Sequence, residues 1–303
     1  MILPAWAKTR RVDMGFLSTI FQAIIQGLTE FLPVSSSGHL SLYQHFTGNS
    51  GEGALMFSAV LHLGTLLAVF ICFRKTIIEL IKEFFFMLKD IFTGKFKWKE
   101  MNGYRRMVIM IIISTLCLLP FILFKDWFEG IAEDSSIFAE GLCFLYTAAI
   151  LFMSDKCTKR NKKYDDITVK DSLTVGFFQG VALLPGVSRS GSTMSAGLFS
   201  GFSRSMAVQY SFILGIPAIL GSCLLEVKDA VSENTVPVSA GYCILGFCVA
   251  AFVGICAIKM VNWLVKSDKF KYFAYYTLIL GVIVLIIAIA EMIMGHPITI
   301  HNS

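Results

Sequence analysis

The chain has 303 residues, of which 55% are hydrophobic and only 16% are charged. Soluble domains carry about 25% charged residues, so this composition excludes a disordered chain, a coiled coil and an ordinary soluble enzyme. It indicates a polytopic membrane protein, in which length is counted in membrane crossings. The net charge of +5 does not indicate a nucleic-acid partner, because most basic residues cluster between apolar segments.

The N-terminal part of the chain contains an interrupted apolar stretch. The first 15 residues carry their charges after a short apolar patch, so we expect no cleaved signal peptide. The stretch that follows, residues 16–40, is interrupted by Glu30, Pro33 and a run of three serines. A proline disfavours helix at the residue before it. We therefore expect one helix that ends near Pro33 and a second half-helix after the serines.

Six further stretches are long and apolar enough to cross a bilayer, which takes about 20 residues. They cover residues 54–73, 107–124, 137–153, 205–225, 239–258 and 272–294. Before the fourth of them, residues 172–200 form a second interrupted stretch, broken by Pro185-Gly186 and by Ser188-Arg189-Ser190-Gly191. The sequence thus predicts an all-α polytopic membrane protein with six full transmembrane helices and two re-entrant broken-helix hairpins.

The basic residues predict the orientation. Residues 74–106, 154–171 and 259–271 hold nine, six and four lysines or arginines, whereas residues 125–136 and 226–238 hold one each and are acidic. Cytoplasmic loops are rich in Lys and Arg, so we expect the three basic loops inside the cell. The first hairpin then enters from the outside and the second from the cytoplasm. This topology puts the N-terminus outside, against the indication of Lys8, Arg10 and Arg11.

The two interrupted stretches resemble each other. Gln26-Gly27 precedes Pro33-Val34-Ser35-Ser36-Ser37-Gly38, and Gln179-Gly180 precedes Pro185-Gly186-Val187-Ser188-Arg189-Ser190-Gly191. Three spans follow each copy, and an odd number of crossings inverts the second unit. We expect a single membrane domain over residues 1–303, with a first repeat at 14–153 and an inverted repeat at 172–294. Paired broken segments of this kind point to a binding site at the membrane midplane, although two Ser/Gly-rich loops can also resemble each other by chance.

Glu30 and Arg189 are the charges most clearly embedded in the broken segments. A charge at membrane depth is costly, which makes each a candidate functional residue. The serines of both motifs are candidate N-caps, and the free N–H groups and positive dipole end of a half-helix bind anions. The planar fork of Arg189 suits phosphate oxygens. The alternative is a purely structural salt bridge between Glu30 and Arg189.

A carboxylate beside a phosphate site is unfavourable unless it holds a metal or handles a proton. Mg²⁺ that bridges Glu30 and substrate phosphates resolves the conflict, and so does general acid/base work by Glu30. The clustered hydroxyls are candidate nucleophiles. His39 lies three residues after Ser36, within helical reach as its base.

Both interrupted motifs resemble motifs of a known protein family. Residues 26–39 (Gln-Gly-Leu-Thr-Glu-Phe-Leu-Pro-Val-Ser-Ser-Ser-Gly-His) and 185–193 (Pro-Gly-Val-Ser-Arg-Ser-Gly-Ser-Thr) resemble the two signature motifs of the bacterial undecaprenyl-pyrophosphate phosphatase family, the BacA/UppP type. The resemblance extends over the whole chain. It implies a multi-pass enzyme of the bacterial plasma (inner) membrane that hydrolyses undecaprenyl pyrophosphate to undecaprenyl phosphate and inorganic phosphate. It also implies recycling of the lipid carrier for cell-wall synthesis, and bacitracin resistance.

The resemblance further implies an active site that faces the outer side, a divalent cation (Mg²⁺ or Ca²⁺), surrounding membrane lipid and frequent homodimers. By position it implies catalytic roles for Glu30, Ser36, His39 and Arg189, phosphate contacts from Gln26, Ser35, Ser37, Ser188, Ser190 and Thr193, and metal binding by Glu30 with Gln26. Many members have glutamate in place of Gln26, and an amide cannot act as a base, which shifts that work onto Glu30. The sequence leaves open whether a serine or an activated water attacks. It also leaves open a secondary transporter or lipid flippase, which uses similar broken helices.

Overall fold

The computed structural model describes residues 15–47, 54–123, 137–157, 161–232, 238–266 and 269–298. Within these ranges the regular elements are helices and no strand occurs, which confirms the predicted all-α class. Residues 1–14, with Lys8, Arg10 and Arg11, lie outside the described ranges, and so do residues 124–136 and 233–237 of the two acidic segments.

The six stretches predicted as spans are helical. They correspond to α3 (Ala54–Cys72), α5 with α6 (Gly103–Leu116 and Leu119–Ile122), α8 (Phe138–Asp155), α11 (Arg204–Ser232), α12 (Ala240–Lys266) and α13 (Lys271–Met294). In the described part, five helices are long and apolar enough to cross a membrane, or up to six if α3 and the helix after it form one bent span. A multi-pass membrane protein is confirmed, and the exact number of crossings stays a prediction.

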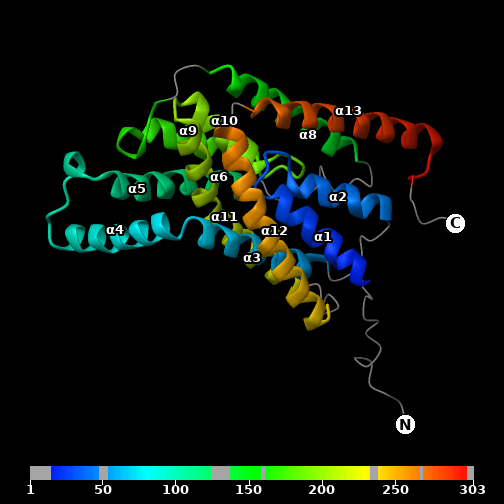
Figure 1. Ribbon diagram of the computed structural model, residues 1–303, viewed down its shortest axis with the longest axis horizontal. Helices are drawn as coiled ribbons and strands as arrows, with labels where there is room; N and C mark the ends of the chain where they lie inside the picture. Colours follow the sequence, from blue (N-terminus) through cyan, green and yellow to red (C-terminus); the bar gives the residue numbers. More distant parts are fainter. Residues whose placement is uncertain are drawn as a thin grey trace, which may run out of the picture.

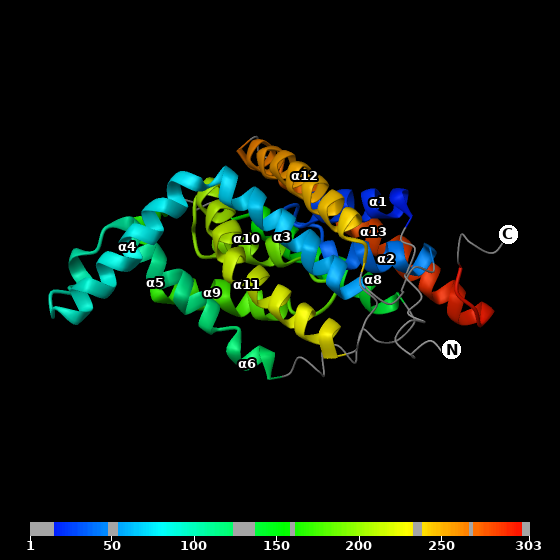
Figure 2. The ribbon, with the colours of Figure 1, turned by 90° about the horizontal axis from the view of Figure 1, so that it is seen from below.

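One segment between the predicted spans contains a helix that was not expected. Residues 74–106 contain α4 (Arg74–Phe92), which is bent by 87° relative to α3 and turns away from it at one end of the molecule (Figure 2). Apolar residues on one face of α4 are buried, whereas its phenylalanines 84–86 are exposed. Arg105 of α5 holds α4 through Glu83 at 2.9 Å and Asp90 at 2.7 Å. The many lysines of this stretch made the helical spacing of its apolar residues hard to recognise in the sequence.

The two interrupted stretches form the predicted helix–break–helix hairpins. The first break separates α1 (Phe16–Thr29) from α2 (Ser36–Thr47), and the second separates α9 (Val169–Val181) from α10 (Arg189–Phe199). Ser35 Oγ accepts a hydrogen bond from the Gly38 N–H at 3.2 Å, and Ser188 Oγ accepts one from the Gly191 N–H at 3.0 Å. Each half-helix therefore begins at a serine N-cap, as its sequence predicts.

Helices from the first half of the chain pack against helices from the second half (Figure 1). α12 packs on α1 and α3, α13 packs on α8, α9 packs on α5, and α11 packs on α3. The two breaks consequently lie inside a bundle to which both halves contribute. The inverted relation of the two repeats stays a prediction.

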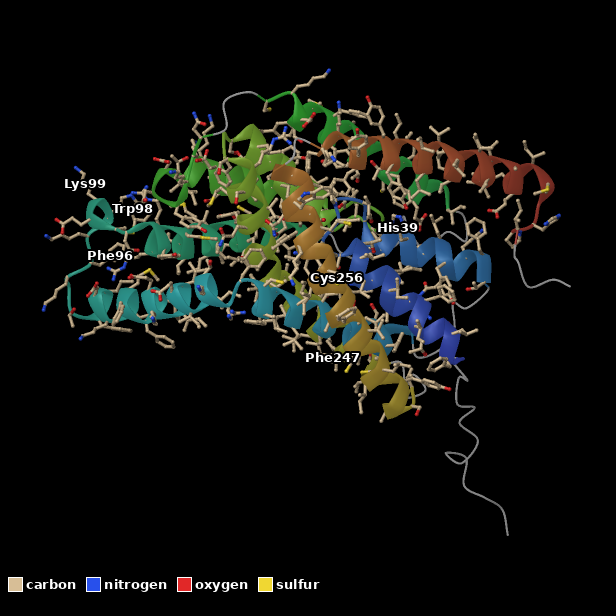
Figure 3. All side chains as sticks on the ribbon, in the orientation of Figure 1. His39, Phe96, Trp98, Lys99, Phe247 and Cys256 are labelled. Carbon is tan, nitrogen blue, oxygen red and sulfur yellow. The ribbon has the colours of Figure 1, made fainter. Side chains whose placement is uncertain are left out.

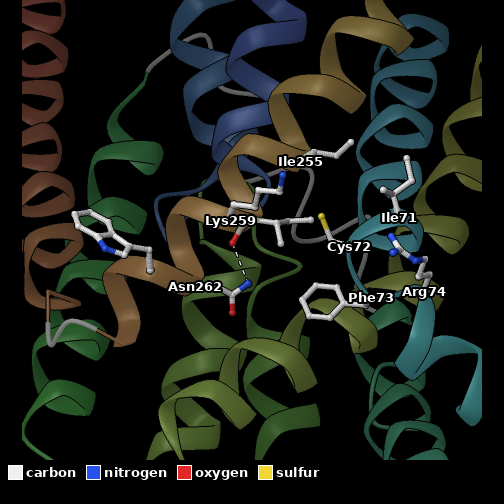
Figure 4. Close-up of a pocket in the computed structure, with 9 residues that line it drawn as sticks. Ile71, Cys72, Phe73, Arg74, Ile255, Lys259 and Asn262 are labelled. Atoms are coloured by element: carbon white, nitrogen blue, oxygen red, sulfur yellow. Dashed lines mark hydrogen bonds between the residues drawn. The ribbon is translucent and has the colours of Figure 1, made fainter.

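An open groove of about 530 Å³ lies where α3 meets α4, beside the last turns of α12 (Figure 4). Arg74 and Lys259 line it from different helices, together with apolar side chains such as Ile71 and Ile255. Both cations belong to segments predicted to face the cytoplasm. Two of the predicted basic segments therefore meet at one groove.

Gly64 sets the spacing between α3 and α12. A Cβ at this position would lie 2.6 Å from the carbonyl oxygen of Phe247, which is on α12 (Figure 3). Gly64→Ala should therefore push the helices apart at a cost of about 1–3 kcal/mol. We expect a lower midpoint of thermal unfolding in detergent. The control is Gly241→Ala on α12, where the new Cβ meets only Ser239 Oγ at 3.8 Å. A midpoint for Gly64→Ala equal to that of the control would contradict the tight contact.

Candidate active site

A cavity of about 410 Å³ lies between the two breaks. Its lining includes six of the predicted site residues: Glu30, Ser36, Ser37, Ser188, Arg189 and Ser190. The remaining wall comes from α1, α3, α5, α6, α9, α11 and the second break. The fold thus brings together two motifs that are far apart in the sequence.

Two reciprocal hydrogen bonds join the breaks. The Gly186 N–H donates to Ser37 Oγ at 3.2 Å, and Ser190 Oγ donates to the Leu32 carbonyl at 2.9 Å. Ser37 and Ser190 occupy the same place, the second position of their half-helices. Each break is therefore held by a hydroxyl from the opposite half-helix. These two serines were predicted as phosphate contacts, and each also makes a hydrogen bond that links the two breaks.

Glu30 is the centre of the cluster, and its carboxylate is 6% exposed. Arg189 Nη2 donates to its Oε1. Its Oε2 accepts from Gln26 Nε2 at 2.8 Å and from Ser36 Oγ at 3.0 Å. A buried carboxylate requires such partners. The salt bridge considered as a structural alternative thus exists, but it lies in a cavity where a phosphate would compete with Glu30 for the guanidinium.

His62 and Glu226 extend this cluster, and neither was predicted as a site residue from the sequence. His62 Nε2 lies 3.8 Å from Glu30 Oε2, and His62 Nδ1 lies 3.5 Å from Glu226 Oε2. Both side chains line the cavity. One signal for His62 was present, because it is the only Asp, Glu, Lys, Arg or His in the predicted span 54–73, and an ionisable residue inside a span is a functional candidate. Glu226 counted only as part of an acidic loop.

Four predicted residues do not line the cavity: Gln26, Ser35, His39 and Thr193. His39 Nδ1 lies 2.6 Å from the Ser35 carbonyl oxygen, its Nε2 lies 2.7 Å from Tyr276 Oη, and its ring stacks on Tyr276. Both ring nitrogens are therefore engaged away from Ser36, whose hydroxyl donates to Glu30. His39 was expected to accept the proton of Ser36. In this structure the Ser36 hydroxyl donates to Glu30 instead.

The Thr193 hydroxyl contacts other residues of the protein and does not face the cavity. Its Oγ1 donates to the Arg189 carbonyl at 2.9 Å and lies 2.6 Å from Ser211 Oγ. Ser188 N–H donates to Thr147 Oγ1 at 3.3 Å. These bonds fix the first turn of α10, which carries Arg189. Their contribution to a phosphate site is thus to position the arginine.

The residues predicted to hold a metal are Glu30 and Gln26. Gln26 Oε1 is buried and has no hydrogen-bond partner among the described residues, so one acceptor beside Glu30 is left for a cation. The described ranges contain no group of three His, Cys, Asp or Glu side chains that could hold a metal. Mg²⁺ is usually bound by one or two carboxylates together with waters and substrate phosphates. The donors present therefore fit an ion that a phosphate helps to bind.

Comparison with known proteins gives the family. The family model described as "Bacitracin resistance protein BacA" matches residues 19–283. The chain belongs to the BacA family. An undecaprenyl-diphosphatase of Alkaliphilus metalliredigens is 37% identical to this BacA chain over 277 residues, which cover 91% of the chain and 100% of the relative. One from Methanosphaera stadtmanae is 38% identical over 280 residues, 91% of the chain and 99% of the relative. Undecaprenyl-diphosphatase 3 of Bacillus cereus is 36% identical over 280 residues, 92% of the chain and 100% of the relative.

Gly215 of α11 lies behind the Arg189 guanidinium in this BacA chain, and a Cβ there would collide with Arg189 Nη1. Gly215→Ala should displace the guanidinium. Because a hydrogen bond to a charged group contributes about 1.5–3 kcal/mol, we expect binding of methylenediphosphonate to weaken about tenfold or more, as measured by titration calorimetry in detergent. Gly241→Ala, far from Arg189 in the sequence and exposed on α12, is the control. Unchanged affinity in Gly215→Ala would show that Arg189 does not bind the phosphonate.

Proposed function

We propose that this chain is a membrane-embedded phosphatase that hydrolyses undecaprenyl pyrophosphate to undecaprenyl phosphate and inorganic phosphate. One observation carries the proposal: the Ser36 hydroxyl donates to Glu30 at 3.0 Å, and Arg189 contacts the same carboxylate inside the cavity. Membership of the BacA family and the names of the relatives support the substrate. Recycling of the lipid carrier for cell-wall synthesis, and bacitracin resistance, follow from that activity.

Each polar group then has a role in the reaction. Arg189 and the N-terminal N–H groups of α2 and α10 bind the oxygens of the terminal phosphate and stabilise the charge of the transition state. Ser36 Oγ, or a water beside it, attacks the terminal phosphorus, the bond from that phosphorus to the bridging oxygen breaks, and undecaprenyl phosphate leaves with that oxygen. If Ser36 attacks, a water then hydrolyses the phosphoserine, which restores the hydroxyl and releases inorganic phosphate. Glu30 accepts the proton of this nucleophile, which is general-base catalysis over a 3.0 Å hydrogen bond. Gln26 keeps the carboxylate oriented by donating to Oε2.

Glu30 must lose that proton before the next turnover. His62 lies between Glu30 and Glu226, at 3.8 Å from the first carboxylate and 3.5 Å from the second. An imidazole in this position can take a proton at one ring nitrogen and release one at the other. We assign His62 and Glu226 to a relay that carries the proton from Glu30 along α3 and α11.

A divalent cation is part of the proposal. Glu30 and the unpartnered Gln26 Oε1 are the side-chain oxygens that would hold it. When bound, such an ion neutralises phosphate charge and polarises the phosphoryl group. It also gives a reason for the carboxylate to stand in a site that otherwise favours anions.

The polyprenyl tail has an apolar groove available to it. The groove has a volume of about 510 Å³ and is lined by Phe70 and by side chains of α4, α5 and α11, with residues such as Ile111, Ile112 and Ile216. Pro217 lines both this groove and the polar cavity. The two spaces are therefore neighbours, as a lipid with a pyrophosphate head requires.

We place the protein in the plasma (inner) membrane with its basic ends in the cytoplasm and its active site open to the outer side. The positive-inside rule supports this orientation, as does the meeting of Arg74 and Lys259, from two of the basic segments, at one groove. Homodimers stay a prediction. A pure transporter is distinguished by chemistry, because it releases no phosphate.

Arg189→Ala should lower phosphate release from polyprenyl pyrophosphates by about 100-fold or more, because a transition-state charge loses its main partner. Arg189→Lys should restore part of the rate, since an ammonium keeps the charge but not the fork. The assay is phosphate release by purified protein with substrates of several chain lengths, and thermal unfolding checks the fold. Wild-type turnover in Arg189→Ala would refute the site, and absence of release from the wild type would favour transport.

The proton relay is tested by His62→Ala. We expect slower turnover that added imidazole partly restores, because a free imidazole can occupy the vacated space and carry the proton. His45→Ala is the matched control: His45 contacts Glu291 at 2.8 Å and does not line the cavity, so its rate should not respond to imidazole. If imidazole leaves the rate of His62→Ala unchanged, His62 has only a structural role.

Removal of divalent cations should stop turnover, and Mg²⁺ should restore it. Gln26→Leu should raise the Mg²⁺ concentration needed for half-maximal rate, because one oxygen ligand is lost. The measurement is phosphate release at controlled free Mg²⁺. Full activity in excess chelator would show that Glu30 does not bind a metal during the reaction and acts only in proton transfer.

A further inference from the structure

The polar cavity contains a buried amide that has no role in the proposed reaction. Gln179 of α9 is 1% exposed and lines the cavity. Neither its Nε2 nor its Oε1 has a hydrogen-bond partner among the described residues. Buried polar groups are nearly always satisfied. An amide left open in a cavity wall is therefore arranged for a ligand.

The equivalent glutamine in the first motif explains why Gln179 lacks a partner. Gln26 and Gln179 both stand before a glycine in the two similar motifs. Gln26 Nε2 donates to Glu30, four residues later on the same helix face. The residue four positions after Gln179 is Leu183, whose side chain cannot accept a hydrogen bond. The second motif thus keeps the amide and omits the carboxylate.

The wall around Gln179 offers few other donors. It is formed by α5, α6, α9 and the residues next to them, and it contains mainly leucines: Leu118, Leu119, Leu183 and Leu184. Thr115 also lines it, but its hydroxyl donates to the Ile111 carbonyl at 2.8 Å. The N–H groups of Gln179 are therefore the open donors of this wall. α5, like α11, also lines the apolar groove, so this wall borders the space that we assign to the lipid tail.

We propose that Gln179 binds the lipid-proximal phosphate of the substrate, while Arg189 and Ser36 bind the terminal phosphate. The inference rests on the proposed phosphatase function and divides its site into two phosphate subsites. Arg189 makes charge-assisted hydrogen bonds, whereas an amide makes weaker neutral ones. The proximal subsite consequently helps to recognise a diphosphate and still releases the monophosphate product once the terminal phosphate has left.

Product inhibition distinguishes the two subsites, because each product occupies one of them. The experiment compares purified wild type, Gln179→Leu and the control Gln44→Leu, a glutamine of α2 outside the cavity. In Gln179→Leu we expect the inhibition constant of polyprenyl monophosphate and the KM of the diphosphate to rise about tenfold. The inhibition constant of inorganic phosphate and kcat should stay within about twofold, since uniform binding is lost rather than transition-state binding.

Gln179→Glu is the second variant, because it keeps the size of the side chain and places a carboxylate in the subsite. It should raise the inhibition constant of the monophosphate further than Gln179→Leu, and thermal unfolding checks that both variants fold. Equal inhibition by polyprenyl monophosphate in wild type and both folded variants would overturn the inference, and so would an equal weakening for inorganic phosphate. Absence of phosphate release from wild type would instead refute the proposed function.

Discussion

The reciprocal hydrogen bonds between the two broken helices are the constraint on which the site depends. A helix break inside a membrane exposes backbone groups that lipid cannot satisfy. Here Ser37 satisfies the Gly186 N–H of the opposite break, and Ser190 satisfies the Leu32 carbonyl. The same bonds fix the start of α2 relative to the start of α10. Glu30, at the end of α1, thereby comes into contact with Arg189.

The scaffold is similar in both halves, but the chemistry is not. Ser36 and Arg189 each hold the first position of a half-helix after a serine N-cap, so one half supplies a hydroxyl and the other a cation. Gln26 has Glu30 as its partner, whereas Gln179 faces the cavity without one. This asymmetry leaves the Gln179 amide free to bind a ligand in the second half, whereas the equivalent amide in the first half orients a carboxylate.

Part of this site was predictable from the sequence, and the reasons differ from residue to residue. Glu30 and Arg189 stood out because charges are rare in apolar segments, and the serines because caps follow simple local rules. His39 was expected to be the base for Ser36, but sequence spacing does not reveal that the Ser35 carbonyl and Tyr276 contact its two ring nitrogens. The pairing of His62 with Glu226 depends on the packing of α3 against α11, which no local pattern encodes. The helix α4 was missed because its lysines suggested a loop.

The most direct test of this account is a structure of the protein with a polyprenyl methylenediphosphonate, which the enzyme cannot hydrolyse. The account predicts that the terminal phosphonate lies in the cavity against Arg189 and the Ser36 hydroxyl, with the Arg189 guanidinium shared between phosphonate and Glu30. A head group bound elsewhere, with the Glu30–Arg189 pair unchanged, would contradict it.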